Sequence, residues 1–291
     1  MIKMTNESIN KNSKNYVKLL TLKKFKRNKR KRHFSKSIIS ILQFLIKLLL
    51  LIILLLLFLL IKSQLRKSYN FIKDTSNIEN IKNIDINYSF YFENKIKGLQ
   101  TSSIEWPLPN QIKFKPFMKK KDLMGFLLFM KPNLTYFEFG SGGSTNIASY
   151  YKLKVYSVES DVLWHNKLKN SNIKASFITV DLKTSELGYP GENTTIEDWK
   201  KYFQAYDCKY NADIILIDGR FRVVCGLDIF PKIRNDTLIL VHDYENRKEY
   251  HILEKYYIKV RKWDILSAFF KNPNVTSIPQ DVYNSYMYDK K

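Results

Sequence analysis

Cysteine is nearly absent from this sequence: Cys208 and Cys225 are the only two among 291 residues. Two thiols are too few for the several bridges of a disulfide-stabilised scaffold or for the four ligands of a structural zinc site. A single bridge between them is chemically allowed in an oxidising compartment. It is not favoured, because a strand predicted at 212–218 separates the two and spans roughly 20 Å, whereas a bridge needs Cα atoms within about 7 Å.

Acidic residues are also scarce: 27 Asp and Glu stand against 49 Lys and Arg, which gives a net charge of +22. A charge of this size invites a nucleic-acid interpretation. The excess is uneven, however, because residues 1–37 hold 13 of the basic residues and a single acid, Glu7. The densest cluster, at 23–33, directly precedes an apolar run, where basic residues set the orientation of a membrane segment. We therefore expect no nucleic-acid partner.

Polar residues almost disappear between residues 38 and 61, IISILQFLIKLLLLIILLLLFLLI, in which Lys47 is the one charged side chain. A helix of this length spans about 36 Å, enough to cross a hydrocarbon core of about 30 Å. The run has no polar face, which argues against a helix of a soluble domain. A cleaved signal peptide is disfavoured as well, since a long segment precedes the run and no A-x-A pattern follows it. The sequence predicts an uncleaved transmembrane helix.

The flanks of this run predict its orientation. The basic tail precedes it, whereas Lys62, Arg66 and Lys67 are the nearest basic residues after it. The positive-inside rule then places the N-terminus in the cytosol and the large C-terminal part in the lumen of the Golgi or the endoplasmic reticulum. A lumenal domain of a single-pass type II membrane protein could become a glycoprotein. Five N-x-S/T sequons follow the run, at Asn87, Asn133, Asn193, Asn235 and Asn274.

Four regions are expected along the chain: a basic cytosolic tail (1–37), a transmembrane helix (38–61), a stem (62–103) and a globular domain (104–291). In the last region short apolar runs alternate with amphipathic ones. This alternation predicts an α/β domain with a Rossmann-like, mostly parallel sheet and helices on both faces. Strands are expected at 135–139, 154–160, 174–181, 212–218 and 237–243, with an edge strand at 263–271. Helices are expected at 118–130, 144–152, 162–170, 222–233 and 245–257, and in the second half of 182–211.

Glycine is scarce too, with nine residues, yet Gly140, Gly142 and Gly143 fall in one turn after the strand predicted at 135–139. Glycine lets a backbone adopt positive φ and approach a ligand closely. Glu159 ends the next predicted strand, where a carboxylate can accept the hydroxyl hydrogens of a ribose. The pair of features indicates a cofactor site at the carboxyl ends of the strands.

The turn lacks the third glycine of the dinucleotide pattern G-x-G-x-x-G, because Thr145 fills that position. That glycine allows close helix packing beneath a pyrophosphate. The P-loop pattern G-x-x-x-x-G-K-[ST] is also missing from the sequence. S-adenosylmethionine (AdoMet) has a ribose and an adenine but no pyrophosphate. The turn therefore favours AdoMet over a dinucleotide.

The residues Glu138-Phe-Gly140-Ser-Gly142-Gly143, taken with Glu159, resemble the first two motifs of class I AdoMet-dependent methyltransferases. The resemblance extends over roughly residues 106–270, where VDL, ADIILIDGR and LILVHDY fall at the places of that family's third, fourth and fifth strands. It implies that Glu138 and the glycines face the methionine end of AdoMet. It also implies that Glu159 binds the ribose and that Asp181 lies near the adenine.

Asp218, His242 and Asp243 stand at the ends of two further predicted strands, which should emerge at the same edge of the sheet as the glycine turn. Methyl transfer to a hydroxyl requires removal of its proton, so a base or a metal must assist. These three residues are therefore the candidates for catalysis. Other roles compete, since Asp243 could cap the following helix and His242 could be a packed or hydrogen-bonded side chain.

A divalent metal is weakly indicated. In catechol O-methyltransferase-like enzymes, acids at these strand ends bind such an ion. Here His242 stands beside Asp243 and no Asp-Asn pair is present. We therefore assign no metal ligands.

Arg220 and Arg222 alternate with Phe221 just beyond Asp218. A guanidinium group matches a carboxylate in geometry, so both arginines are candidates for binding an acidic substrate. Ordinary surface arginines are the alternative. A narrower resemblance favours the first reading: the type II anchor with ESDVLWHNKL, ILIDG and LVHDYENRKEYHILEKYY looks like the plant glucuronoxylan 4-O-methyltransferases of the Golgi.

The sequence therefore predicts a membrane-anchored, AdoMet-dependent O-methyltransferase. Its partners would be the bilayer and a hydroxyl-bearing substrate such as an acidic glycan. A membrane-anchored binding protein with a degenerate, non-catalytic Rossmann-like domain is one alternative. An NAD-dependent oxidoreductase is another, and Thr145 disfavours it.

Overall fold

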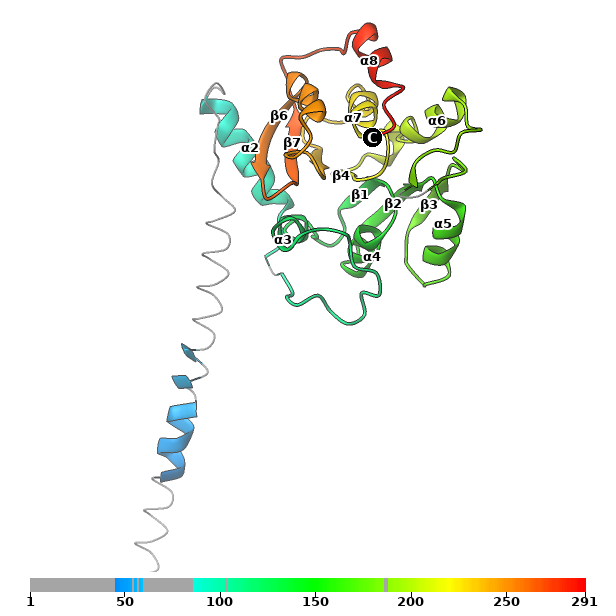
Figure 1. The fold of residues 1–291 in the computed structure, drawn as a ribbon. Helices are drawn as coiled ribbons and strands as arrows, with labels where there is room; N and C mark the ends of the chain where they lie inside the picture. Colours follow the sequence, from blue (N-terminus) through cyan, green and yellow to red (C-terminus); the bar gives the residue numbers. More distant parts are fainter. Residues whose placement is uncertain (1–44, 54, 57, 60–85, 103, 186–187) are drawn as a thin grey trace, which may run out of the picture. The chain divides into compact units, whose positions relative to one another are not determined.

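The computed structural model describes residues 45–53, 55–56, 58–59, 86–102, 104–185 and 188–291. The chain divides into two compact units, Met1–Ile72 and Lys73–Lys291. In the first unit the described residues are helical (Figure 1). Their leucines and isoleucines are about half exposed. The predicted tail at 1–37 and both ends of the predicted span at 38–61 lie outside the described residues. None of the helices in the described ranges is long and apolar enough to cross a membrane.

A seven-stranded sheet organises the second unit, with the strand order β3-β2-β1-β4-β5-β7-β6. Strands β1 to β5 run parallel, and β7 is antiparallel to both β5 and β6. All residues of β4 and β5 are buried, as expected for the inner strands of a parallel sheet covered on both faces. The strands are β1 (Thr135–Phe139), β2 (Lys154–Glu159), β3 (Ser176–Thr179), β4 (Ile214–Ile217), β5 (Leu238–Val241), β6 (Tyr257–Lys262) and β7 (Ser267–Lys271).

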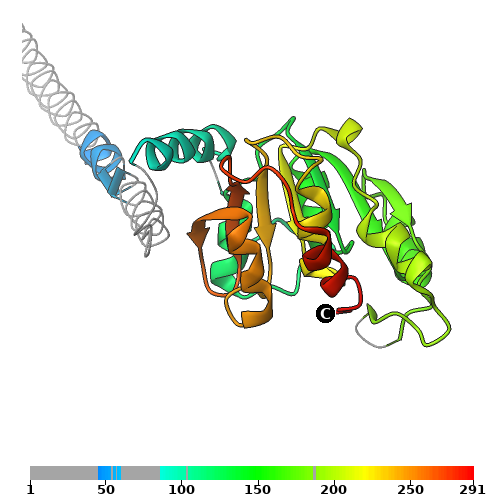
Figure 2. The same cartoon turned by 90° about the horizontal axis from the view of Figure 1, so that it is seen from above.

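Helices cover both faces of this sheet (Figure 2). Side chains of β1 alternate between two cores, because Phe137 and Phe139 join one apolar cluster and Tyr136 joins the other. The first cluster includes side chains of α6 and α7, and the second includes side chains of α2, α3 and α4. The helices are α2 (Ile86–Leu99), α3 (Lys120–Leu127), α4 (Gly143–Tyr150), α5 (Val162–Lys169), α6 (Ile196–Phe203), α7 (Arg222–Ile229) and α8 (Gln280–Tyr286), with 3₁₀ segments η2 (Cys208–Tyr210) and η3 (Lys248–Lys255). The α/β architecture with a mostly parallel sheet is as predicted.

The elements predicted after residue 244 differ from those in the structure. The helix expected at 245–257 is the 3₁₀ segment η3, and the chain enters β6 at Tyr257. The strand expected at the edge, β7, instead lies between β5 and β6. Its first four residues are buried, as an inner strand requires, whereas in the edge strand β6 only Tyr257 and Val260 are buried.

Helix α2 falls within the segment expected to be a stem, and it packs on the last two strands. The ring of Phe92 stacks on that of Phe270 with centroids 5.0 Å apart. The carboxylate of Glu93 accepts two hydrogen bonds from Arg261, of 2.8 and 2.9 Å. Residues 86–99 therefore belong to the compact unit that carries the sheet.

Candidate functional site

The ends of β1 and β4 meet backbone to backbone just beyond the sheet. Gly140 adopts a φ of 93°, and a Cβ atom placed on it would lie 2.7 Å from the Cα atom of Gly219. The chain runs outward from β1 through β2 to β3 and then returns to the other side of β1 as β4. The contact thus lies at the point where strand order reverses, which is where ligands bind in open α/β sheets.

The other two glycines of the turn have different roles. The N–H group of Gly142 donates a hydrogen bond of 2.7 Å to the hydroxyl oxygen of Thr145, which stabilises the start of α4. A Cβ atom on Gly143 would lie 2.1 Å from the backbone nitrogen of Pro116, so this glycine lets another segment cross the helix N-terminus. Thr145 also donates its own hydroxyl hydrogen to Glu138. The residue in the third glycine position therefore holds the turn by its side chain.

Glu138 lies beneath the turn and does not line a cavity. Its carboxylate is fully buried and accepts hydrogen bonds from Tyr136 (2.8 Å), Ser144 (2.6 Å) and Thr145. Burial raises the pKa of this carboxyl to about 7, although the three hydroxyl donors favour the charged form. In the structure Glu138 therefore supports the turn from below instead of presenting its carboxylate to a ligand.

Glu159 is placed as a ribose-binding acid would be. Its Oε1 atom accepts hydrogen bonds from the backbone N–H groups of Ser160 (2.7 Å) and Asp161 (2.9 Å), and Oε2 accepts from that of Ser141 (2.9 Å). Burial raises its pKa, and these three N–H groups oppose the shift. A carboxylate oxygen can accept two hydrogen bonds, so Oε2 retains a free position for a ligand hydroxyl.

A cavity of about 460 Å³ opens at these strand ends. Its volume lies within the range of small-molecule sites, which is about 300–1,000 Å³. The guanidinium of Arg220 lies 4.0 Å from the ring centroid of Tyr189, which holds this arginine at the cavity wall by a cation–π contact. The cavity is lined by Gly140, Glu159, Ser160, Asp161, Trp164, Ser185, Gly188, Tyr202, Asp218, Gly219 and Arg220.

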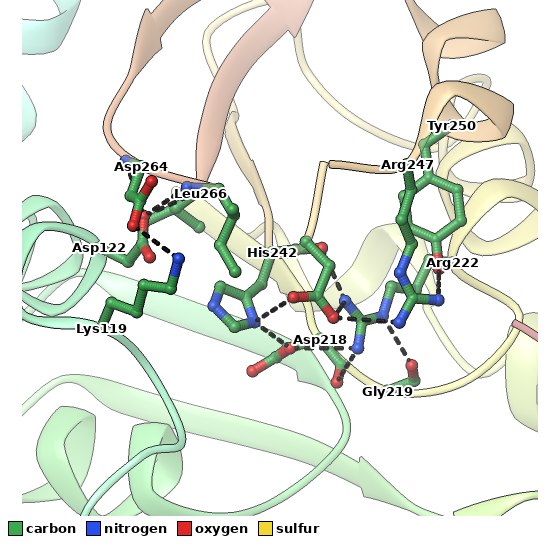
Figure 3. Close-up of polar contacts among 12 residues, drawn as sticks. Lys119, Asp122, Asp218, Gly219, Arg222, His242, Arg247, Tyr250, Asp264 and Leu266 are labelled. Carbon is green, nitrogen blue, oxygen red and sulfur yellow. Dashed lines mark hydrogen bonds and ion pairs between the residues drawn. The ribbon is translucent and has the colours of Figure 1, made fainter. Parts of the chain in front are cut away.

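Among the three catalytic candidates, Asp218 lines the cavity and His242 stands behind it. The Nδ1 atom of His242 lies 2.9 Å from Oδ1 of Asp218 (Figure 3). Burial alone would raise the pKa of Asp218, but the hydrogen bond with His242 and the charge of Arg222 hold it below its ordinary value. Burial would lower the pKa of His242, but Asp218 and Asp243 raise it. The Nε2 atom of His242 is buried and has no hydrogen-bond partner within the described ranges.

Arg220 lines the cavity, whereas Arg222 does not. The side chain of Arg222 is buried and donates hydrogen bonds to three carbonyl oxygens, of Gly219 (2.9 Å), His242 (2.7 Å) and Asp218 (3.3 Å). It also forms an ion pair of 2.9 Å with Asp243. Figure 3 shows Arg222 joining the ends of β4 and β5. Phe221, directly before α7, has a left-handed backbone conformation with a φ of 58°.

Asp243 and Asp181 do not line the cavity. The carboxylate of Asp243 pairs with Arg222 and, at 3.4 Å, with Arg247, and η3 begins only after Arg247, so Asp243 does not cap a helix. Asp181 is exposed, pairs with Lys183 and does not line the cavity.

Sequence reasoning missed two residues that line the cavity, Trp164 and Tyr202, and a third, Asp122, that fixes a loop. Trp164 lines the cavity and donates its indole N–H to the carbonyl of Ser141 at 2.8 Å. Asp161 caps α5, because its carboxylate accepts a hydrogen bond of 2.9 Å from the backbone N–H of Trp164. Tyr202 comes from α6, and a Cβ atom on Gly219 would lie 2.0 Å from its hydroxyl oxygen. Asp122 accepts three backbone N–H groups at 264–266 and so fixes the loop before β7. No local pattern marks Tyr202 or Asp122.

The residues fit AdoMet better than they fit a metal ion. Gly140, Gly219 and Glu159 line one cavity, and the two glycines pack so closely that a Cβ atom on Gly140 would overlap the backbone of Gly219. Within the described part of the chain, no group of three His, Cys, Asp or Glu side chains is placed to hold a metal ion. Both cysteines have free thiols, with Cys208 exposed and Cys225 buried.

The chain matches no protein-family model, and no curated protein sequence matches it. Among solved structures it is similar to a methyltransferase-like protein from Silicibacter pomeroyi, over 62% of this chain and 100% of that one, with 24% identity and a TM-score of 0.54. A TehB-like SAM-dependent methyltransferase from Corynebacterium glutamicum aligns over 65% of this chain and 100% of its own, at 11% identity and a TM-score of 0.35. MycE methyltransferase, in complex with Mg, SAH and mycinamycin VI, covers 52% of this chain and 45% of its own, at 15% identity and a TM-score of 0.30.

The first of these likenesses shows the fold. Together with the strand order it shows that the second unit has the same α/β fold as that methyltransferase-like protein. The two weaker alignments add no support.

Proposed function

We propose that the protein is an AdoMet-dependent O-methyltransferase anchored in a membrane, with an acidic glycan as a candidate acceptor. The observation that carries the proposal is the shared cavity. Gly140, Glu159 and Asp218 come from the ends of three different strands and line one space of about 460 Å³ at the reversal of strand order. An AdoMet site with a nearby acceptor needs a glycine that lets the ligand approach the backbone, a carboxylate that binds the ribose and an ionised carboxylate near the acceptor. Gly140, Glu159 and Asp218 would supply these three groups.

Each of these groups would have a distinct task. The free acceptor position on Oε2 of Glu159 would take a ribose hydroxyl hydrogen, while Gly140 and Gly219 would admit the ligand close to the backbone. Trp164 would provide an apolar wall. AdoMet, when bound, supplies an electrophilic methyl group on a positively charged sulfur.

Asp218 is the carboxylate available to the acceptor. It is ionised at neutral pH, so it can accept a hydrogen bond from a hydroxyl and take up the proton as the new bond forms, although its lowered pKa makes it a weaker base than an ordinary aspartate. His242 and Arg222 fix the orientation of Asp218 from behind, and we assign them as positioning residues. Arg220, held by Tyr189 at the cavity wall, is the arginine that could meet a carboxylate of an acidic acceptor.

Membrane anchoring rests on the sequence, through the apolar run at 38–61 and the basic tail before it. We propose a cytosolic N-terminus and a lumenal domain. Protease protection of intact vesicles, together with a glycosidase-sensitive shift that disappears when all five asparagines of the sequons are changed to Gln, would support this topology. Digestion of the domain from the cytosolic side would refute it.

Binding tests the cofactor assignment. The full-length chain, purified in mild detergent, is titrated with AdoMet and with NAD in a calorimeter. We expect AdoMet to bind and Glu159→Gln to weaken binding by about 10- to 100-fold, because a charge-assisted hydrogen bond is lost. Glu197→Gln removes an exposed carboxylate on α6 and is the matched control, for which we expect no change. A folded chain that binds NAD and not AdoMet would establish the oxidoreductase alternative.

Transfer tests the reaction. With AdoMet labelled at the methyl group, the chain is assayed against neutral and uronic-acid oligosaccharides. We expect Asp218→Asn to bind AdoMet as the parent does but to lower kcat by about 10²- to 10⁴-fold, as for loss of a general base. If Asp218→Asn transfers methyl at the parent rate, Asp218 is not the base. If the parent binds AdoMet and transfers methyl to none of these acceptors or to small hydroxyl compounds, the non-catalytic binding protein is favoured.

A further inference from the structure

Residues 106–121 form a strongly basic surface segment, which we call the basic loop. It ends in the first turn of α3 and contains no acidic residue. Its aromatic residues are Trp106, Phe114 and Phe117. Figure 1 shows the connection between α2 and α3 running out past α4. Five exposed lysines lie in the loop: Lys113, Lys115, Lys119, Lys120 and Lys121.

The middle of the basic loop is fixed to the domain. The backbone N–H of Phe114 donates a 3.0 Å hydrogen bond to Oδ1 of Asn146 in α4. The backbone at Pro116 packs directly on Gly143 at the start of the same helix. The ring of Phe114 meets that of Trp164 edge to face, with centroids 5.7 Å apart. The loop therefore presents its remaining side chains from a defined position.

Phe117 is fully exposed from this fixed position, with a relative exposure of 101%. Trp106 is also exposed, and the ammonium of Lys120 lies 5.3 Å from its ring centroid. Leu163, next to Trp164 at the start of α5, is 82% exposed. Exposed large apolar side chains in a segment rich in basic residues are typical of an interaction surface.

We propose that the basic loop docks on the surface of a phospholipid bilayer, with Phe117 among the acyl chains and the lysines against the lipid phosphates. The lysines complement phosphate in charge, and Trp and Lys are the residues that favour the interface between headgroups and hydrocarbon. The same chain carries exposed leucines in its first unit, within the run predicted to enter a bilayer. Because Phe114 contacts Trp164, which lines the cavity, docking would bring the cavity wall to the membrane surface.

Single-stranded nucleic acid is the other partner that lysines interleaved with aromatic rings can bind. The bilayer is favoured because the aliphatic side chain of Leu163, which follows Val162 at the start of α5, is 82% exposed and cannot stack on bases. Nucleic acid is therefore one outcome of the test.

The experiment uses the full-length chain reconstituted in vesicles of phosphatidylcholine and phosphatidylserine. In a Cys208→Ser background, which removes the exposed thiol, Phe117→Cys is labelled with an environment-sensitive fluorophore. The control carries the same fluorophore at Glu197→Cys, on an exposed position of α6. Quenching by lipids with a spin label on the acyl chain then reports contact with the bilayer interior, independently of the span at 38–61.

We expect the fluorophore at position 117 to be quenched at least about twofold more than the one at position 197. Adding Lys113→Gln, Lys115→Gln and Lys121→Gln should reduce the difference, most clearly in vesicles rich in phosphatidylserine. Equal quenching at positions 117 and 197 would overturn the proposal. So would a spectral change at position 117 that appears with a single-stranded oligonucleotide in detergent and not with lipid. Neither result depends on whether the chain binds AdoMet.

Discussion

The Nδ1 atom of His242 lies 2.9 Å from Oδ1 of Asp218, although the two residues follow different strands, β4 and β5. This contact joins the carboxylate at the cavity to a side chain that is almost completely buried. The partners shift each other's pKa in opposite directions, upward for His242 and downward for Asp218, against the effect of burial on both. The ionised pair is therefore favoured in the folded state.

The pair should make stability depend on pH. The raised pKa of His242 gives stabilisation that is complete below its ordinary value of 6.5 and is lost as pH rises through the folded value. The lowered pKa of Asp218 gives stabilisation that is complete above 3.8 and is lost as pH falls through the folded value. We therefore expect His242→Gln to be most destabilising between about pH 4 and 6.5, as measured by denaturant unfolding.

Asp218→Asn is the control for this dependence. In the Asp218→Asn background, the free-energy change caused by His242→Gln should depend on pH much less than it does in the parent protein. A constant difference between parent and His242→Gln from pH 4 to pH 9 would mean that the pair is not ionised.

Glu138 should make stability depend on pH in the direction opposite to that expected for Asp218. Its pKa rises from 4.5 in the unfolded chain to about 7 in the folded one, so the unfolded state releases the proton first and stability falls as pH rises between these values. The loss amounts to about 3 kcal/mol for a shift of this size. In Glu138→Gln this decline should be absent. Thermal melting of both proteins from pH 4.5 to 8 checks it, and parallel curves would contradict it.

The Gly140–Gly219 contact predicts a strong effect of a single methyl group. Gly140→Ala combines a φ of 93° with a Cβ atom 2.7 Å from Gly219, so we expect a loss of at least about 3 kcal/mol and loss of AdoMet binding. Gly98→Ala is the matched control, because its Cβ would meet no atom within 4 Å in helix α2, and it should be neutral or stabilising by up to about 1 kcal/mol. Equal melting midpoints for the two variants would refute the contact.

Substitution of Arg222 should lower stability, whereas the same substitution of Arg220 should not. Arg222→Lys cannot reproduce the fork that joins Asp218, Asp243 and three carbonyl groups, so we expect a loss of about 3 kcal/mol in unfolding free energy. Arg220→Lys leaves a partly exposed cation at the cavity wall and should change stability by less than about 0.5 kcal/mol. Urea unfolding of both variants measures the difference. A larger loss in Arg220→Lys would reverse the assignment.

Much of the fold could be predicted because its signals are local. The apolar runs of β1, β2 and β4, each followed by an amphipathic segment, predicted a parallel sheet, and the strand bounds at Thr135–Phe139 agree with the structure. The β6–β7 pair was predicted in part only. The residues from Lys248 read as a helix by periodicity, and what makes Tyr257–Lys262 a strand is pairing with β7, which a local pattern does not contain.

The candidate site divides in the same way. The glycine turn and Glu159 could be identified from spacing, because a strand, a tight turn and a ribose acid recur at fixed distances along the chain. The roles of the other acids could not. Glu138, Asp181 and Asp218 all stand at or near strand ends, yet one is buried beneath the turn, one is paired with Lys183 at the surface and one lines the cavity.

The sequence by itself determined the α/β class, the basic and apolar N-terminal segments and the position of the glycine turn, since each depends on composition or on a short period. The tertiary structure decided which side chains meet. Arg220 and Arg222 are two residues apart and look alike in the sequence, but the left-handed φ of Phe221 separates them, so that Arg220 faces the cavity and Arg222 is buried between Asp218 and Asp243. Direction at such a turn depends on packing between β4, α7 and β5, and only the folded chain contains that information.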